Sequence, residues 1–103
     1  MESINEMKQT PSKLFNPYRV WILIDLKFSG KLRFNKLRDD IGLSNGNLST
    51  HLRALEKEGF IKSNTFLDKK KLVSYIIITF EGMKALDEFR EQLKNMEKVL
   101  SKN

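Results

Sequence analysis

The chain has 103 residues, which suffices for one compact domain and argues against a multidomain enzyme. Hydrophobic residues make up 40% and charged residues 31%, and cysteine is absent, which is typical of a folded protein without disulfides or thiolate metal sites. The net charge is +6: residues 1–80 hold 14 Lys and Arg against 8 Asp and Glu, whereas residues 81–103 hold 5 of each, so the basic excess lies in the first part and is compatible with a polyanionic partner.

Residues 1–13 are polar and weakly patterned, and we expect an N-terminal arm there, either frayed or a short docked helix. This segment has no apolar stretch that could act as a signal peptide. The longest apolar run, Val20 to Ile24, is much shorter than the ~20 residues of a membrane span. We therefore expect no membrane partner and a cytoplasmic location.

The first helix is predicted to begin at Asn16–Pro17 and to run to about Phe28. Asn can cap free backbone amides, and Pro suits the first helical position because its missing N–H costs nothing there. Apolar side chains lie almost all round this helix, which predicts contact on more than one side. Tyr18 and Trp21 are interpreted as core or dimer-interface residues.

A short alternating segment, Leu32–Phe34, is predicted to pair as a small edge of a sheet formed later in the chain. A second helix is expected from about Asn35 to Ile41. Gly42 then suits a residue that leaves a helix in the left-handed conformation.

Ser44 is predicted to cap a third helix from about Asn45 to Glu58. After Gly59 the pattern changes to that of β-strands, with the strands expected at Phe60–Leu67 and Leu72–Thr79. The charged residues Asp68–Lys71 would form the tip of this hairpin.

Thr79 is predicted to cap the last helix, whose apolar residues recur at spacings of 3 and 4, as in a helix that packs lengthwise on another. This seam could pack on the first helix of the same chain or on a second chain. Length favours the second chain for the distal residues. A helix from about Phe80 to Ser101 would be ~33 Å long, which is longer than a domain of ~80 residues can cover. We therefore predict dimerisation through Leu86, Phe89, Leu93, Met96 and Leu100.

The expected order is α-β-α-α-β-β-α, a mainly α (α+β) arrangement. With the segments 16–19, 32–37 and 41–61, it resembles the small winged helix-turn-helix transcriptional regulators related to the MarR and ArsR groups. The run Leu43-Ser44-Asn45-Gly46-Asn47-Leu48-Ser49-Thr50-His51-Leu52-Arg53-Ala54-Leu55-Glu56 is a specific signal of the resemblance, and Thr79–Gly82 resembles the Thr-x-Glu-Gly start of their last helix. The resemblance implies a homodimeric DNA-binding regulator, with an arm at 1–13, a winged-helix DNA-binding domain at 14–80 and a dimerisation helix at 81–103.

The third helix has a face suited to reading DNA. With its leucines toward the core, the opposite side presents no acidic residue, and Asn, Arg and Thr can each contact base edges in the major groove. A merely solvated helix surface is the alternative. We predict DNA contacts from Ser44, Asn45, Asn47, Ser49, Thr50, His51, Arg53 and Lys57.

Two basic clusters are predicted to hold the DNA backbone. One includes Lys31, Arg33, Lys36 and Arg38, and the other is the hairpin tip with Lys69, Lys70 and Lys71. The tip has a second interpretation as a solvated turn whose lysines prevent aggregation of strand edges.

Other chemistry is not expected. His51 is the one histidine, so a histidine metal cluster within one chain is impossible, and it is predicted to pack at the helix flank or to reach a phosphate. Asp39 and Asp40 do not face each other on a helix and are expected to balance Arg38 and Lys36 or to form a surface patch. We expect no enzyme activity, cofactor or metal, and no small-molecule effector can be identified.

The resulting hypothesis is a sequence-specific regulator of double-stranded DNA. A repressor is expected rather than an activator, because the chain is too short to carry an added activation domain. The alternatives are a winged-helix protein-interaction module without DNA binding, and a regulator whose DNA affinity is set by a small ligand between the first and last helices.

Overall fold

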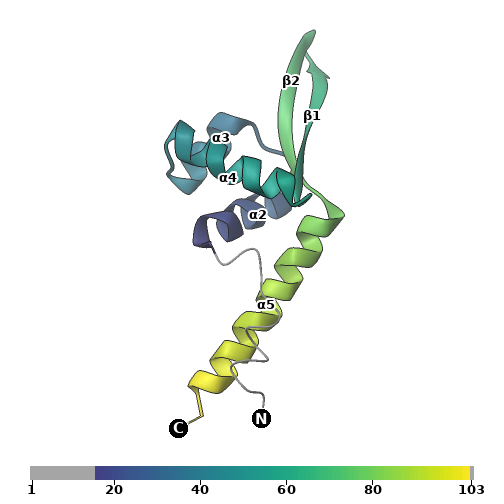
Figure 1. Cartoon of the computed structure of the whole chain (residues 1–103). Helices are drawn as coiled ribbons and strands as arrows, with labels where there is room; N and C mark the ends of the chain where they lie inside the picture. Colours follow the sequence, from purple (N-terminus) through teal and green to yellow (C-terminus); the bar gives the residue numbers. More distant parts are fainter. Residues whose placement is uncertain (1–15, 103) are drawn as a thin grey trace.

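The structure, a computed structural model, describes residues 16–102. Three helices are followed by a two-stranded hairpin, the wing, and a long last helix, as Figure 1 shows. The predicted arm at 1–13 lies outside the described residues. The elements are α2 (Pro17–Ser29), α3 (Phe34–Ile41), α4 (Asn45–Lys57), β1 (Ile61–Asp68), β2 (Lys71–Ile78) and α5 (Phe80–Leu100).

Helix α2 begins as predicted, because the Asn16 side chain accepts a hydrogen bond of 2.9 Å from the Tyr18 amide. Its Ile22, Leu23 and Leu26 side chains are fully buried. As predicted, α2 is contacted on more than one side, by α3, α4, α5 and β2, although Trp21 remains 60% exposed. The side of α2 that carries Tyr18, Trp21 and Phe28 remains exposed in the single chain.

Helices α3 and α4 form a tight helix-turn-helix. Gly42 ends α3 in the left-handed conformation at φ 80°, which glycine adopts without a steric penalty. The Ser44 hydroxyl then accepts a hydrogen bond of 3.1 Å from the Asn47 amide and caps α4. Leu48 and Leu55 of α4 are buried in the core, and Leu52 packs against it.

The wing is a regular antiparallel hairpin with Ile61 paired to Ile78 at its base and Asp68 paired to Lys71 at its tip. Its strands reach further toward the tip than predicted, because the turn has only two residues, Lys69 and Lys70. Both have positive φ, 49° and 68°. A two-residue turn with positive φ at both positions matches the right-handed twist of the flanking strands, so the strands can stay paired up to the turn.

The predicted strand at Leu32–Phe34 shrinks to a single bridge. Leu32 exchanges both backbone hydrogen bonds with Ile76 of β2, at 3.1 and 2.8 Å. Phe34 already belongs to α3, so the segment has no length left for a longer strand. The bridge nevertheless attaches the wing to the helical body.

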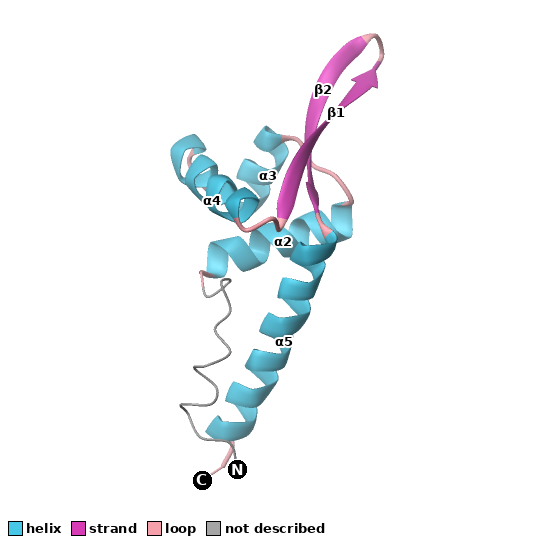
Figure 2. Cartoon of the chain, turned by 45° about the vertical axis from the view of Figure 1, so that its right-hand side comes forward, coloured by secondary structure: helices cyan, strands magenta, loops and turns pink. Residues whose placement is uncertain are grey.

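Helix α5 begins where the Thr79 hydroxyl accepts a 3.1 Å hydrogen bond from the Gly82 amide. Leu86 and Phe89 pack against the core of the same chain. Beyond them the helix extends past the other described helices, on the side away from the wing (Figures 1 and 2). None of the helices within residues 16–102 is both long and apolar enough to span a membrane.

Candidate nucleic-acid interface

Helix α4 presents a polar face to solvent, opposite its buried leucines. Thr50, Arg53 and Lys57 are exposed on it, as are Gly46 and Asn47 in its first turn. These side chains offer donors and acceptors that match base edges, and the small Gly46 allows close approach. The face agrees with the one predicted from the helical period.

The first turn of α4 is held by Arg38 of the preceding helix. The Arg38 Nη1 donates a 2.7 Å hydrogen bond to Asn45 Oδ1, and its Nε donates to Asp39 at 3.0 Å. Arg38 therefore connects the two helices of the helix-turn-helix, a contact that its predicted role at the DNA backbone did not include.

The carboxyl groups of Asp25 in α2 and Asp40 in α3 lie close together where the two helices meet. Lys36 Nζ and Asp40 Oδ1 are 2.7 Å apart, which confirms the expected balance of Asp40 by Lys36, just as Asp39 balances Arg38. The hydrogen bond to Asp40 raises the pKa of Lys36, and burial, followed by the neighbouring Asp40 carboxylate, raises the pKa of Asp25. Within residues 16–102 there is no group of three or more His, Cys, Asp or Glu that could hold a metal ion.

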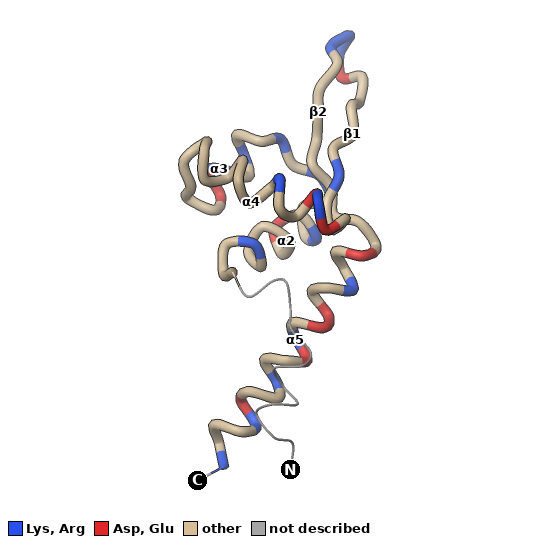
Figure 3. Tube along the Cα trace, in the orientation of Figure 1, with Lys and Arg blue, Asp and Glu red and all other residues tan. Residues whose placement is uncertain are grey.

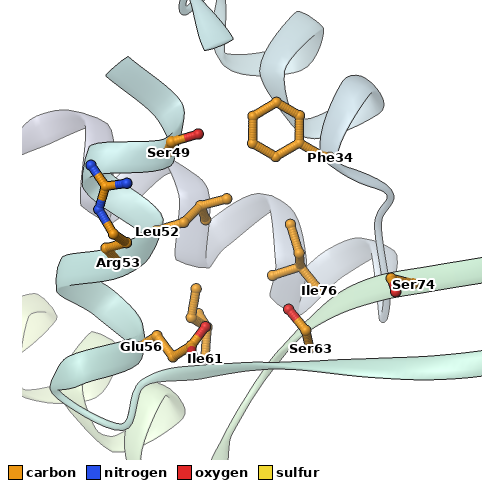
Figure 4. Close-up of a pocket in the computed structure, with 9 residues that line it drawn as sticks. All are labelled: Phe34, Ser49, Leu52, Arg53, Glu56, Ile61, Ser63, Ser74 and Ile76. Carbon is orange, nitrogen blue, oxygen red and sulfur yellow. The ribbon is translucent and has the colours of Figure 1, made fainter. Parts of the chain in front are cut away.

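A cleft of about 310 Å³ separates α4 from the wing (Figure 4). Apolar side chains from α3, α4 and both strands form part of its lining. Polar groups come from both of its sides and include the Arg53 guanidinium. The lining consists of Phe34, Ser49, Leu52, Arg53, Glu56, Ile61, Ser63, Ser74 and Ile76.

Glu56 adds an exposed acidic residue beside the predicted outer face of α4, which itself has none. It is exposed, one turn after Arg53, and lines the same cleft. The prediction considered only the stripe opposite the leucines, whereas the cleft exposes a wider arc of α4. Its carboxylate repels phosphate and can accept a hydrogen bond from cytosine N4, so it restricts what can enter beside Arg53.

The wing carries lysines at its tip, where Figure 3 shows Lys and Arg gathered at the turn between β1 and β2. Lys69, Lys70 and Lys71 are all exposed. Lys31 is placed differently: its Nζ lies 4.4 Å from the ring centroid of Phe66 and 4.6 Å from that of Tyr75. This double cation–π contact attaches the body to the wing, and no local pattern indicated it because the three residues are far apart in the chain.

His51 lies at the flank of α4 that faces α2. Its ring centroid is 5.7 Å from that of Tyr18, and its Nδ1 accepts a 3.3 Å hydrogen bond from Arg19 Nε. Burial first, and then the positive charge of Arg19, lower the pKa of His51. The packing role predicted for His51 is thus observed.

This environment predicts a pH dependence of stability. Because the folded-state pKa of His51 is lowered, the unfolded chain binds more protons, so its contribution to stability is complete above about pH 6.5 and is lost as the pH falls below that value. We expect the free energy of unfolding of the wild type to fall relative to that of His51→Gln between about pH 6.5 and pH 5. Urea unfolding of both proteins across this range measures the difference, and parallel curves would contradict the prediction. Asp25 is common to both proteins and cancels in the comparison.

Apolar side chains are exposed on α2 and along α5. Tyr18 and Trp21 of α2 are 47% and 60% exposed, and Leu93 and Leu100 of α5 are 48% and 76% exposed. Met96 is half-buried. The predicted dimerisation seam is thus divided: Leu86 and Phe89 contact the core of their own chain, and the distal leucines are left available.

The sequence is similar to that of known proteins over most of its length. Residues 19–100 match the winged helix DNA-binding domain family. An uncharacterised protein of Methanocaldococcus jannaschii is 32% identical over 87 residues, which cover 84% of this chain and 95% of that protein.

Solved structures of other proteins have a similar fold. A transcriptional regulator homologue from Pyrococcus horikoshii is 29% identical with a TM-score of 0.78, covering 98% of this chain and 99% of that one. A MarR-family protein from Enterococcus faecalis is 19% identical with a TM-score of 0.74, covering 99% and 92%, and shows the shared fold. The chain therefore belongs to the winged helix DNA-binding domain family, whose fold is that of transcriptional regulators and not of enzymes.

Proposed function

We propose that this protein is a homodimeric, sequence-specific repressor that binds double-stranded DNA. The observation that carries the proposal is the exposed polar face of α4 beside a wing with a lysine tip. A dimer bound across successive major grooves would block access to the same DNA, so repression by occlusion is the proposed mode. The proposed location is the cytoplasm.

Helix α4 is the proposed recognition helix. Arg53 suits a bidentate contact with guanine, Asn47 a contact with adenine, and Thr50 a contact with the thymine methyl group. The residues around them complete the contact to bases and to nearby phosphates. The full proposed set is Ser44, Asn45, Asn47, Ser49, Thr50, His51, Arg53 and Lys57.

The basic clusters are proposed to position the protein on the phosphate backbone without reading sequence. Lys69, Lys70 and Lys71 extend from the wing tip, and Lys31, Arg33, Lys36 and Arg38 belong to the body. Lys31, Lys36 and Arg38 already have partners within the chain, so we expect them to contribute less than the wing lysines.

The proposed division assigns residues 14–80 to DNA binding and residues 81–103 to dimerisation, with residues 1–13 as an arm. Exposed Leu93 and Leu100 on α5 support pairing with a second chain, because they are seven residues apart on one side of the helix, the spacing of a helix that packs lengthwise on another. A dimer would space two recognition helices for half-sites ~34 Å apart on a near-palindromic sequence.

Two substitutions should distinguish contacts to the bases from contacts to the phosphate backbone. We expect Arg53→Ala to weaken binding to the preferred sequence by ~1–3 kcal/mol and to relax sequence preference, because alanine cannot hydrogen-bond the base edge. Lys70→Ala should weaken binding to all duplexes alike, because it removes a phosphate contact. Selection of bound sequences from a random pool, followed by fluorescence anisotropy with preferred and scrambled duplexes, measures both effects. Equal weakening on every sequence for both variants would contradict the assignment.

The salt dependence of binding tests the proposal as a whole. The log of the affinity for a generic duplex should fall linearly with the log of the salt concentration, with a slope of ~0.9 per phosphate neutralised. Undetectable binding at low salt would instead favour the alternative in which the same fold serves as a protein-interaction module.

A further inference from the structure

The guanidinium of Arg38 is held by three oxygen atoms of the helix-turn-helix. Its Nε donates to Asp39 Oδ1 at 3.0 Å, and its Nη1 donates to Asn45 Oδ1 at 2.7 Å and to Asn35 Oδ1 at 3.4 Å. The Arg38 side chain is 27% exposed, whereas that of Lys36 on the same helix is 66% exposed. These bonds hold Arg38 in one orientation, and the shortest of them reaches the first residue of α4.

The bond to Arg38 determines how the Asn45 amide is turned. A guanidinium has N–H donors and no acceptor, so the Asn45 atom that lies 2.7 Å from it is the carbonyl oxygen Oδ1 and not the amino nitrogen. The two arms of the planar amide point in different directions, so the Nδ2 amino group is directed away from Arg38. Because Asn45 is exposed, it presents the two N–H donors of Nδ2 to a partner.

Adenine and guanine require different groups from an asparagine. A bidentate contact with adenine uses both arms of the amide, because N6 donates to Oδ1 and N7 accepts from Nδ2. Arg38 already occupies Oδ1, so an adenine amino group would be a second donor at the same oxygen, next to a positive charge. Guanine instead presents two acceptors, O6 and N7, in the major groove. An asparagine that offers donors is therefore better matched to guanine.

The position of Asn45 suits a contact with a base. It is the first residue of α4, directly after the Ser44 cap, and Gly46 and Asn47 beside it are also exposed. In helix-turn-helix proteins the N-terminal residues of the recognition helix contact base edges. A phosphate is the other acceptor of this kind on DNA, and the two are distinguished by whether the contact depends on the base.

We propose that Arg38 is a positioning residue that turns the Asn45 amide so that Asn45 prefers guanine to adenine in the major groove. This inference rests on the proposed function and adds to it a residue of α3 that sets sequence preference through a residue of α4. Removal of the guanidinium should free the Asn45 amide to rotate by half a turn, after which its two arms can match adenine.

Selection of bound sequences from a random pool tests this role with the full chain. We expect the wild type to prefer guanine over adenine about tenfold at one base pair of each half-site, identified as the pair at which Asn45→Ala loses its preference. Arg38→Met should reduce this ratio to about one or reverse it, while the preferences at other pairs persist. Methionine is a good helix former, and thermal unfolding checks that the variant is folded.

Lys36→Met is the matched control. Lys36 and Arg38 both belong to α3, and each forms an ion pair with an acidic residue of the same helix. Arg38 differs in that it also donates to Asn45. Both variants lose one positive charge, so a merely electrostatic role would weaken binding alike on every sequence. We expect Lys36→Met to keep the guanine preference. The same loss in Lys36→Met, or an unchanged preference in Arg38→Met, would overturn the positioning role.

Asn45→Asp tests the contact with Arg38 in place. The carboxylate retains an acceptor for the guanidinium but has no N–H donor, so the guanine preference should be lost although the bond between α3 and α4 is kept. A guanine preference that survives in Asn45→Asp would contradict the inference. So would a wild type that prefers adenine at this pair, or an Asn45→Ala profile identical to that of the wild type.

Replacement of guanine by 7-deazaguanine at the same pair distinguishes a base from a phosphate, because it removes the N7 acceptor and leaves the backbone unchanged. We expect the wild type to bind the modified duplex several-fold more weakly, and Asn45→Ala to bind both duplexes alike. Equal binding of both duplexes by the wild type would indicate a phosphate contact and overturn the inference, while the proposed function would stand. A wild type without any sequence preference would overturn both.

Discussion

Leu93→Glu/Leu100→Glu should convert the proposed dimer to a monomer and lower the affinity for a duplex with two half-sites about 100-fold or more. The expected effect is large because two linked recognition helices bind as one unit. Once the first helix is bound, the second is held near its half-site at a high effective concentration. Sedimentation equilibrium measures the dimer, and fluorescence anisotropy with one-site and two-site duplexes measures the affinity.

The physical reason lies in the distal part of α5. Leu93 and Leu100 are 48% and 76% exposed and lie beyond Leu86 and Phe89, which contact the core of their own chain. A charged carboxylate at either position would have to be buried in a dimer without a compensating partner, which is costly. In the monomer the same carboxylates remain in water, so the fold itself should tolerate them.

Lys94→Gln/Lys98→Gln is the control for charge. It changes the net charge by the same two units on the same helix and leaves the leucines in place. We expect it to remain dimeric and to retain most of its affinity. A leucine variant that stays dimeric, or a monomer with undiminished affinity for the two-site duplex, would contradict the proposed role of α5.

Gly82→Ala should lower the free energy of unfolding by about 3 kcal/mol, in the upper range for an overpacked core. An added Cβ would overlap the carbonyl oxygen of Phe60 and lie 2.7 Å from Ile78 Cγ1. That carbonyl accepts a 2.9 Å hydrogen bond from the Thr79 amide, so it cannot move away without breaking the start of α5. Urea unfolding followed by circular dichroism measures the change.

Gly46→Ala is its matched control. Gly46 is also helical, and an added Cβ there would meet nothing within 4 Å beyond its chain neighbours and the backbone of its own helix, so alanine should stabilise the protein by about 0.5 kcal/mol through its better helix propensity. The two substitutions add the same methyl group and should have effects of opposite sign. Equal stability of the two variants would show that α5 does not press on the backbone that follows α4.

The helix starts could be predicted because their chemistry is local. Asn16, Ser44 and Thr79 each accept a hydrogen bond from an amide two or three residues further along the chain. Gly42 ends α3 at positive φ for a similarly local reason. The period of the leucines in α4 likewise predicted which of its faces would be exposed.

Predictions that involved distant residues were less complete. The hairpin was expected, but its turn is two residues long because the strands pair up to Asp68 and Lys71. Glu56 was missed as a cleft residue because the cleft is made jointly by α4 and the wing. The uniform apolar pattern of α2 did not indicate that Trp21 would remain exposed.

Sequence alone was therefore enough to predict the order of the elements, their caps, the exposed face of α4 and the winged helix-turn-helix family, since these depend on residues within a few positions of one another. It could not predict that Lys31 lies over Phe66 and Tyr75, or that Ser63 and Ser74 share the wing face that lines the cleft. Those arrangements depend on strand register and on the Leu32–Ile76 bridge, which form only when distant segments pack together. A slip of one residue in that register would move every side chain of the strand to the other face, and local propensity does not determine the register.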